Sequence, residues 1–208
     1  MTKGMLIIIS GPSGSGKGTV AKKLCEDDRY ALSVSVTTRP KRAGDVEGKD
    51  YYFCSVAEFF EKLENNDLLE TTLYVGNYYG TPRSYVEQKI NEGKVVILEI
   101  EVNGALQVRM NEPEAVLVFL IPQSMSELRR RLMKRATEND DVIDDRLRRA
   151  NEEIELIDKY DYLVVNDEID NAVRTINHIV DAELHKPKRN HDIIRKFKEG
   201  NKHVKTVI

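Results

Sequence analysis

The hydrophobic residues of the chain form several short, unbroken runs, separated by segments with helical spacing. Apolar runs that are bounded by glycine or polar clusters are typical of strands buried on both faces of a parallel sheet. Helical patterns follow several of these runs, so we predict an α/β fold in which helices cover a parallel sheet in three layers. The predicted buried strands lie at residues 6–9, 95–101, 115–121 and 162–165.

Residues 36–82 interrupt this frame with shorter patterns. Small apolar and hydroxyl residues alternate there, and serine, glycine and proline recur as helix caps and turn residues. The pattern predicts a small β-rich insertion within the parallel frame. Its predicted elements are strands at 31–38, 51–53 and 68–75, a capped helix from Ser55, a turn at 76–80, and a helix that begins with Thr81 and Pro82 and ends near Gly93.

The first apolar run leads into a glycine-rich loop, Gly-Pro-Ser-Gly-Ser-Gly-Lys-Gly-Thr, at residues 11–19. Between a strand and a helix, such a loop turns backbone N–H groups toward a phosphate, and the helix N-terminus adds positive charge. Lys17 is placed to reach the outer phosphates. The alternative is a left-handed turn without a ligand. In the usual pattern a hydroxyl residue follows the lysine, whereas here Gly18 precedes Thr19, which weakens the case for a direct side-chain ligand to magnesium.

Composition narrows the class of protein. The hydrophobic fraction of 40% and the charged fraction of 32% indicate a globular chain with a proper core. No apolar run approaches the roughly 20 residues that span a bilayer, and no signal peptide precedes the loop, so a cytoplasmic location is expected. Cys25 and Cys54 have no metal-binding spacing and are expected to be unpaired thiols. The first 177 residues contain no histidine, which argues against a histidine-based triad or zinc site near the loop.

Charged residues mark two further regions. Glu99 and Glu101, two positions apart at the end of a predicted strand, are expected to point to one face, where ligands of parallel sheets bind. The alternative is a solvated strand exit. Two arginine-rich helical segments flank a polar break at 136–141 and resemble a mobile cover over phosphates. The alternative for them is an exposed helical pair held by salt bridges four residues apart.

These motifs together resemble the guanylate kinase family over the chain to about residue 185. The resemblance rests on the loop at 11–19 and on longer motifs: Ser-Val-Thr-Thr-Arg-Pro-Lys-Arg-Ala-Gly-Asp at 35–45, Gly-Lys-Asp-Tyr at 48–51, Gly-Asn-Tyr-Tyr-Gly-Thr-Pro at 76–82, Leu-Glu-Ile-Glu-Val-Asn-Gly-Ala-Leu-Gln-Val at 98–108 and Val-Val-Asn-Asp at 164–167. It implies a phosphate-loop core at 1–35, 83–124 and 147–187, a GMP-binding insertion at 36–82, a lid at 125–146, and a basic tail at 188–208.

The resemblance also implies an activity: Mg²⁺-dependent transfer of the ATP γ-phosphoryl group to GMP, and to dGMP, giving ADP and GDP. The implied catalytic residues are Lys17, Arg131, Arg135 and Arg146. The implied ATP-binding residues are Gly11, Pro12, Ser13, Gly14, Ser15, Gly16, Lys17, Gly18, Thr19 and Asn166. The implied GMP-binding residues are Ser35, Arg39, Arg42, Tyr51, Glu70, Tyr79, Thr81 and Glu101. Magnesium is expected to be held mainly by nucleotide phosphates and water.

The sequence departs from the family pattern in places, and some questions stay open. Glu101 stands where aspartate is common, and Ala136 where glycine is common, after the lid arginine. Residues 186–208 carry eight basic and two acidic residues and are expected to form a solvated extension, the alternative being a site for an acidic partner or nucleic acid. Otherwise no DNA, RNA or membrane partner is expected. The oligomeric state, monomer or homodimer, is open. Competing functions are a kinase of another monophosphate, an unrelated P-loop NTPase, and a non-catalytic guanylate-kinase-like binding module.

Overall fold

A computed structural model describes residues 4–135 and 140–200 of the chain. Its centre is a five-stranded sheet in which every neighbouring pair of strands is parallel. The spatial order is β2-β7-β1-β8-β9. The strands are β1 (Met5–Ser10), β2 (Tyr30–Leu32), β7 (Val95–Glu99), β8 (Val116–Ile121) and β9 (Tyr162–Val165). The predicted α/β class and parallel sheet are therefore confirmed.

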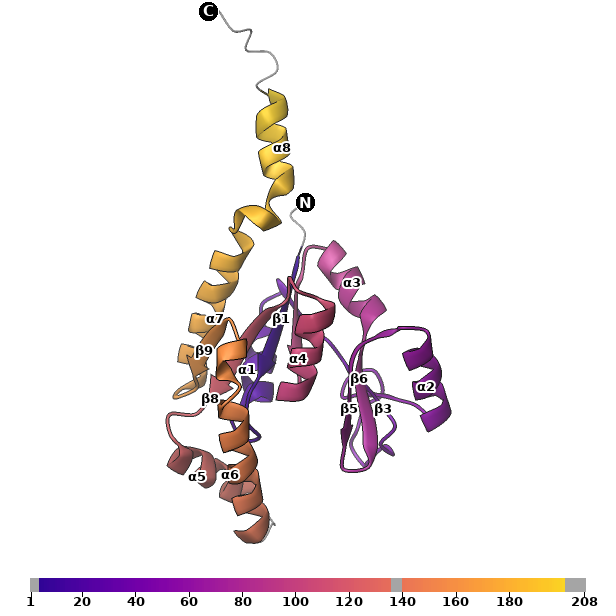
Figure 1. Ribbon diagram of the computed structural model, residues 1–208, viewed down its shortest axis with the longest axis vertical. Helices are drawn as coiled ribbons and strands as arrows, with labels where there is room; N and C mark the ends of the chain where they lie inside the picture. Colours follow the sequence, from indigo (N-terminus) through magenta and orange to yellow (C-terminus); the bar gives the residue numbers. More distant parts are fainter. Residues whose placement is uncertain (1–3, 136–139, 201–208) are drawn as a thin grey trace, which may run out of the picture.

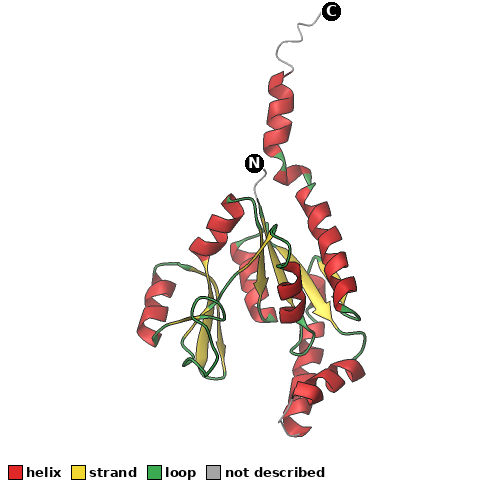
Figure 2. Ribbon diagram, turned by 180° about the vertical axis from the view of Figure 1, so that it is seen from behind, coloured by secondary structure: helices red, strands yellow, loops and turns green. Residues whose placement is uncertain are grey.

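Helices cover both faces of this sheet (Figures 1 and 2). Successive side chains of a strand point to opposite faces, so Ile7 and Ile9 of β1 pack with one helical layer and Leu6 and Ile8 with the other. The first layer is α1 (Lys17–Leu24) and α7 (Ile169–Leu184), and the second is α3 (Arg83–Asn91) and α4 (Val102–Asn111). Because both faces are covered, the strands are apolar almost throughout.

A second, four-stranded sheet lies beside the core, with strand order β4-β3-β6-β5 (Figure 1). Phe59 packs with Val36 and Leu68 in a small hydrophobic cluster of its own. The capping box predicted from Ser55 and Glu58 is present. The elements are β3 (Val36–Thr37), β4 (Tyr52–Phe53), α2 (Val56–Glu64), β5 (Leu68–Tyr74) and β6 (Asn77–Pro82).

Two predictions in this region are wrong. The single strand expected over 31–38 is two strands, because the chain leaves the core sheet after β2 and joins the second sheet at β3. The turn expected over 76–80 is mostly strand β6, and α3 begins at Arg83 with Pro82 as its N-cap. The glycine at position 80 has a packing reason within this strand, because a Cβ there would lie 3.0 Å from the Glu70 carbonyl oxygen.

Two helices lie at the carboxyl end of the core strands, on the side away from the second sheet (Figure 1). They are α5 (Met125–Arg135) and α6 (Asp140–Ile154). Leu128, Leu132, Ile143 and Ala150 form their shared core. Ala136 and most of the expected break at 136–141 lie outside the described residues.

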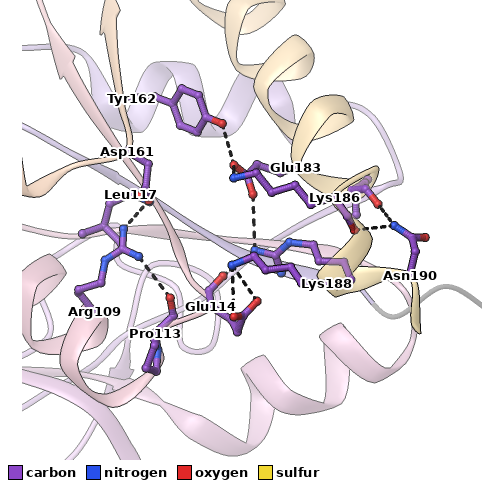
Figure 3. Close-up of polar contacts among 12 residues, drawn as sticks. Arg109, Pro113, Glu114, Leu117, Asp161, Tyr162, Glu183, Lys186, Lys188 and Asn190 are labelled. Carbon is purple, nitrogen blue, oxygen red and sulfur yellow. Dashed lines mark hydrogen bonds and ion pairs between the residues drawn. The ribbon is translucent and has the colours of Figure 1, made fainter. Parts of the chain in front are cut away.

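The end of α7 is fixed to the core by polar contacts (Figure 3). Buried Glu183 accepts hydrogen bonds from the Tyr162 hydroxyl at 2.7 Å and from the Lys186 ammonium at 2.5 Å. Arg189, in the short 3₁₀ turn η2 (Pro187–Arg189), donates to the Glu114 carbonyl at 2.6 Å. The contacts of the core therefore extend past the point where the basic tail was expected to begin.

Beyond this turn, α8 (His191–Gly200) projects away from the body of the molecule (Figure 1). The side-chain amide of Asn190 donates to the Leu184 carbonyl at 2.7 Å, and the backbone carbonyl of Asn190 accepts from the N–H groups of Ile193 and Ile194. Asn190 thus joins the end of α7 to the start of α8. Within the described ranges, no helix is long and apolar enough to cross a membrane.

Candidate active site

The glycine-rich loop connects β1 to α1 and wraps around the ammonium group of Lys17. Lys17 is the first residue of α1 and is only 7% exposed. Its Nζ donates to the Gly11 carbonyl at 2.7 Å and to the Pro12 carbonyl at 3.2 Å. Gly11 has a φ of 138°, and a Cβ there would lie 2.2 Å from the Leu120 carbonyl oxygen, so only glycine fits. The loop therefore holds a buried cation at a helix N-terminus, the arrangement that binds phosphate.

Asn166 and Arg131 close one side of the loop. The Asn166 amide donates to the Ser15 carbonyl at 2.8 Å. Arg131 of α5 donates to the carbonyls of Asn166 at 2.9 Å and Ser15 at 3.2 Å, and Glu127 holds its guanidinium from the other side at 2.7 Å. Asn166 and Arg131 line a cavity of about 660 Å³, together with Gly16, Thr19 and Lys134. This cavity is large enough for a nucleoside next to the phosphate loop.

The other predicted lid arginines differ in position. Arg146 of α6 is half-buried and lines a cavity of about 560 Å³ together with Ser13 and Glu101. Arg135 ends α5, and its side chain is outside the described part of the chain. Several other arginines form ion pairs of the kind expected for an exposed helical pair, such as Arg148 with Glu152 at 2.7 Å. The ion pairs of an exposed helical pair are therefore present, while Arg131 contacts the phosphate loop and Arg146 lines a cavity beside it.

A further cavity, of about 530 Å³, lies between the core and the second sheet. Seven of the eight residues expected to bind GMP line it, together with Lys17, and the eighth, Thr81, contacts one of them. Glu99 also lines it. The seven are Ser35, Arg39, Arg42, Tyr51, Glu70, Tyr79 and Glu101.

Arginine and tyrosine side chains line this cavity together with Asp45 and Asp50. Arg39 is 9% exposed, its guanidinium lies 5.3 Å from the centre of the Tyr51 ring, and it pairs with Asp45 at 2.9 Å. The Tyr51 and Tyr79 rings meet edge to face, with centroids 5.7 Å apart. Burial raises the pKa of Tyr51, so its phenol stays protonated and available as a donor. An arginine with paired donors beside two phenols is suited to a phosphate.

The same cavity also contains a buried carboxylate. Glu70 is 5% exposed, and its Oε1 accepts a hydrogen bond from the Thr81 hydroxyl at 2.8 Å. The Thr72 hydroxyl contacts the other carboxylate oxygen at 3.4 Å. Burial raises the pKa of Glu70, and the hydrogen bonds from Thr81 and Thr72 oppose that rise. A buried carboxylate facing a cavity is suited to a ligand with adjacent N–H donors.

Glu99 and Glu101 both line the cavity of about 530 Å³. Strand β7 ends at Glu99, and Glu101 is the N-cap of α4, so the prediction that both lie on one strand is wrong. The chain turns between them, yet both line a space of about 360 Å³ with Lys17, Gly18 and Thr19. Glu101 Oε1 is 4.0 Å from Lys17 Nζ. Among the described residues, no three His, Cys, Asp or Glu side chains cluster as a metal site.

Glu153 of α6 is an acidic residue near Glu101 that the sequence analysis did not single out. It lines the same cavity as Arg146 and Glu101. Burial, and then the negative charge of Glu101, raise its pKa to about 7, and the positive charge of Lys17 opposes the rise. Its helix shows no motif that could have drawn attention to it.

A phosphate loop with a buried lysine, beside a nucleoside-sized cavity and a further cavity that carries arginines, tyrosines and a buried carboxylate, defines a phosphate-loop kinase of nucleoside monophosphates. The guanylate kinase family model matches residues 3–183. The chain is 48% identical over 200 residues to the guanylate kinase of Clostridium tetani, covering 96% of each chain, and 50% identical over 200 residues to that of Bacillus cereus, covering 95% and 98%. The crystal structure of guanylate kinase from Anaplasma phagocytophilum superposes with a TM-score of 0.73 at 37% identity, covering 90% of each chain. The chain belongs to the guanylate kinase family.

Proposed function

We propose that this chain transfers the γ-phosphoryl group of ATP to GMP, and to dGMP. The cavity of about 660 Å³ beside the phosphate loop would hold ATP, the cavity of about 530 Å³ would hold GMP, and Lys17 would lie between the two nucleotides. The observation that carries the proposal is the cavity of about 530 Å³, which Arg39 and Arg42 line together with Tyr51 and Tyr79, and which also contains the carboxylate of Glu70. Phosphoryl transfer leaves little covalent chemistry to the protein, so positioning and charge neutralisation supply most of the rate.

The acceptor nucleotide is assigned from the chemistry of its two ends. Arg39, Arg42, Tyr51 and Tyr79 would bind the phosphate of GMP. Guanine offers two adjacent donors, N1–H and the 2-amino group, which the two oxygens of Glu70 would accept. Ser35 and Thr81 hydroxyls would lie near guanine O6. Adenine has an unprotonated N1 and no amine at C2, so the same carboxylate would disfavour it.

The donor nucleotide is assigned to the phosphate loop and the cavity beside it. Residues 11–19 would bind the ATP phosphates through backbone N–H groups, and Asn166 would border the adenine. Lys17, Arg131, Arg135 and Arg146 would place positive charge on the transferring phosphoryl group, where negative charge must be stabilised. We further propose that the insertion at 36–82 and the lid at 125–146 close over the nucleotides and exclude water.

A divalent cation accompanies ATP in this family of kinases, and we propose Mg²⁺. The donor set fits, since two carboxylates and the Thr19 hydroxyl border the loop where β- and γ-phosphates would lie. Glu99 and Glu101 would hold water molecules of the ion, with phosphate oxygens as its remaining ligands. When bound, Mg²⁺ would neutralise charge on those phosphates. A cytoplasmic location and the lack of a nucleic-acid partner stay predictions.

The test is a coupled assay of ADP release with ATP and each of GMP, dGMP, AMP, CMP and UMP. The proposal expects turnover with GMP and dGMP and a kcat/KM at least a hundred-fold lower, in order of magnitude, with the other three. Preference for another monophosphate would favour a related kinase. ATP hydrolysis that no monophosphate stimulates would favour an unrelated NTPase, and the absence of any turnover would favour a non-catalytic module.

A further inference from the structure

The backbone around Glu70 is held by side chains from another part of the chain. Glu70 lies in β5, the edge strand of the second sheet. The pairing of β5 with β6 is irregular between Leu68 and Thr71, which are the ladder residues on either side of Glu70. An irregular ladder at a sheet edge is a poor support for a side chain that must be placed to within a few tenths of an ångström.

Helix α4 supplies the missing support. The Gln107 side-chain amide accepts from the Thr71 N–H at 3.1 Å and donates to the Thr71 carbonyl at 2.9 Å. One turn further along the helix, the Asn111 amide donates to the Leu69 carbonyl at 3.0 Å. Alternate residues of a strand direct their backbone groups to the same edge, so these two amides act on β5 as a neighbouring strand would.

The same face of α4 also contacts the carboxylate itself. A Cβ on Gly104 would lie 3.0 Å from Glu70 Oε2, so the helix backbone lies directly against the carboxylate. The helix is in turn fixed to the core sheet, since Ala105 and Val108 are fully buried in a cluster that contains Leu98 of β7. The same cluster contains Leu69 of β5. Three positions on one face of α4, each a turn apart, therefore meet the three residues 69–71.

We infer that Gly104, Gln107 and Asn111 are positioning residues that determine the preference for guanine, acting through the placement of the Glu70 carboxylate. The inference rests on the proposed role of Glu70. Thr71 offers one donor and one acceptor to Gln107, so only a side chain that carries both satisfies it. Glutamate at 107 would set an oxygen against the Thr71 carbonyl, and methionine would keep the length and remove both hydrogen bonds.

The test compares GMP with IMP, which keeps N1–H and lacks the 2-amino group. A carboxylate that is well placed gains from the second donor, whereas a displaced one does not. In Gln107→Met the GMP/IMP ratio of kcat/KM is expected to fall about five- to ten-fold, mainly through KM for GMP, with KM for ATP unchanged. In Gln107→Glu the GMP/IMP ratio should fall at least as far. Gln88→Ala, which removes an exposed amide that bonds to Glu92 on α3, is the matched control and should leave the ratio unchanged.

Gly104→Ala separates positioning from folding. Alanine favours a helix more than glycine does, so a lower GMP/IMP ratio in this variant would come from pressure on the carboxylate and not from a weaker α4. If Gln107→Met fails to fold, Gly104→Ala and Asn111→Leu make the same comparison. The inference further requires that Gln107→Met change the ratio much less when Glu70→Gln is already present.

The outcomes distinguish this inference from the proposed function. If Glu70→Gln lowers the GMP/IMP ratio while the α4 variants keep the parent value, the inference is overturned and the role of Glu70 stands. If Glu70→Gln also keeps the parent ratio, Glu70 does not bind the base and both fail. Equal losses with GMP and IMP in the α4 variants would mean a merely structural helix, which overturns the inference as well.

Discussion

Replacing Lys17 with methionine tests the phosphate loop most severely. In the parent, Nζ donates two hydrogen bonds to loop carbonyls and lies 4.0 Å from Glu101. The substitution leaves the Gly11 and Pro12 carbonyls without this donor, which costs about 1–3 kcal/mol each when the groups stay buried. It also removes the cost of a nearly buried charge, so we expect a net loss of stability of about 1–2 kcal/mol.

The effect on turnover should be larger than the effect on stability. A preorganised group that stabilises developing charge contributes about 2.7–4 kcal/mol, or roughly 10²- to 10³-fold in kcat. We expect Lys17→Met to lose at least that factor in the ADP-release assay while urea unfolding shows a folded protein. Lys17→Arg keeps the positive charge but does not fit the loop as the ammonium group does, and should lose less of kcat than Lys17→Met. A folded Lys17→Met enzyme with kcat within about three-fold of the parent would refute the assignment of the loop.

Three further predictions follow from other contacts. Arg131→Ala should lower kcat by roughly 10²-fold, whereas Arg129→Ala, on the same helix, should change it less than about three-fold; equal effects would count against the lid. Because the pKa of Glu153 is raised to about 7, its contribution to stability is present below pH ~4.5 and is lost as pH rises through about 7. Urea unfolding at pH 5 and pH 8 should thus differ less in Glu153→Gln, and an unchanged difference would contradict this. Deleting 191–208 should change the free energy of unfolding by less than about 1 kcal/mol and kcat/KM by less than about two-fold. Deleting 187–208 should lower the free energy of unfolding by about 2–4 kcal/mol, because it also removes the contacts of the turn before α8. Similar unfolding curves for the two deletions would refute the role of that turn.

The parts of the fold that the sequence predicts are those set by local patterns. Strand β9 coincides with the predicted run at 162–165, and the capping box at Ser55 forms as expected, since burial and capping depend on residues close in sequence. The divided strand at 31–38 could not be predicted, because its alternation is the same whichever sheet each half joins. Helix α4 lacked a start signal, as its N-cap, Glu101, makes no side-chain capping bond.

The candidate site also combines what local motifs predict with what only the fold reveals. The motifs identify the expected GMP-binding residues, most of which line one cavity in the structure, and the structure adds the residues that support them. Gln107 lies 36 positions from Thr71, with which it exchanges two hydrogen bonds, and a contact of that separation leaves no periodic signal in the sequence. Glu153 was missed for a related reason: its raised pKa depends on burial and on Glu101, in a different part of the fold.

The most direct test of the central claim is the GMP/AMP ratio of kcat/KM in the parent and in Glu70→Gln, with ATP saturating. Glutamine removes the charge and sets a donor against one of the guanine donors. A hydrogen bond to a charged group contributes about 1.5–3 kcal/mol, so kcat/KM for GMP should fall roughly ten- to a hundred-fold or more. Activity with AMP should fall less, or rise, because the repulsive carboxylate has gone. A lower ratio in Glu70→Gln is the predicted result, and the same ratio in both proteins would contradict the assignment of guanine to this cavity.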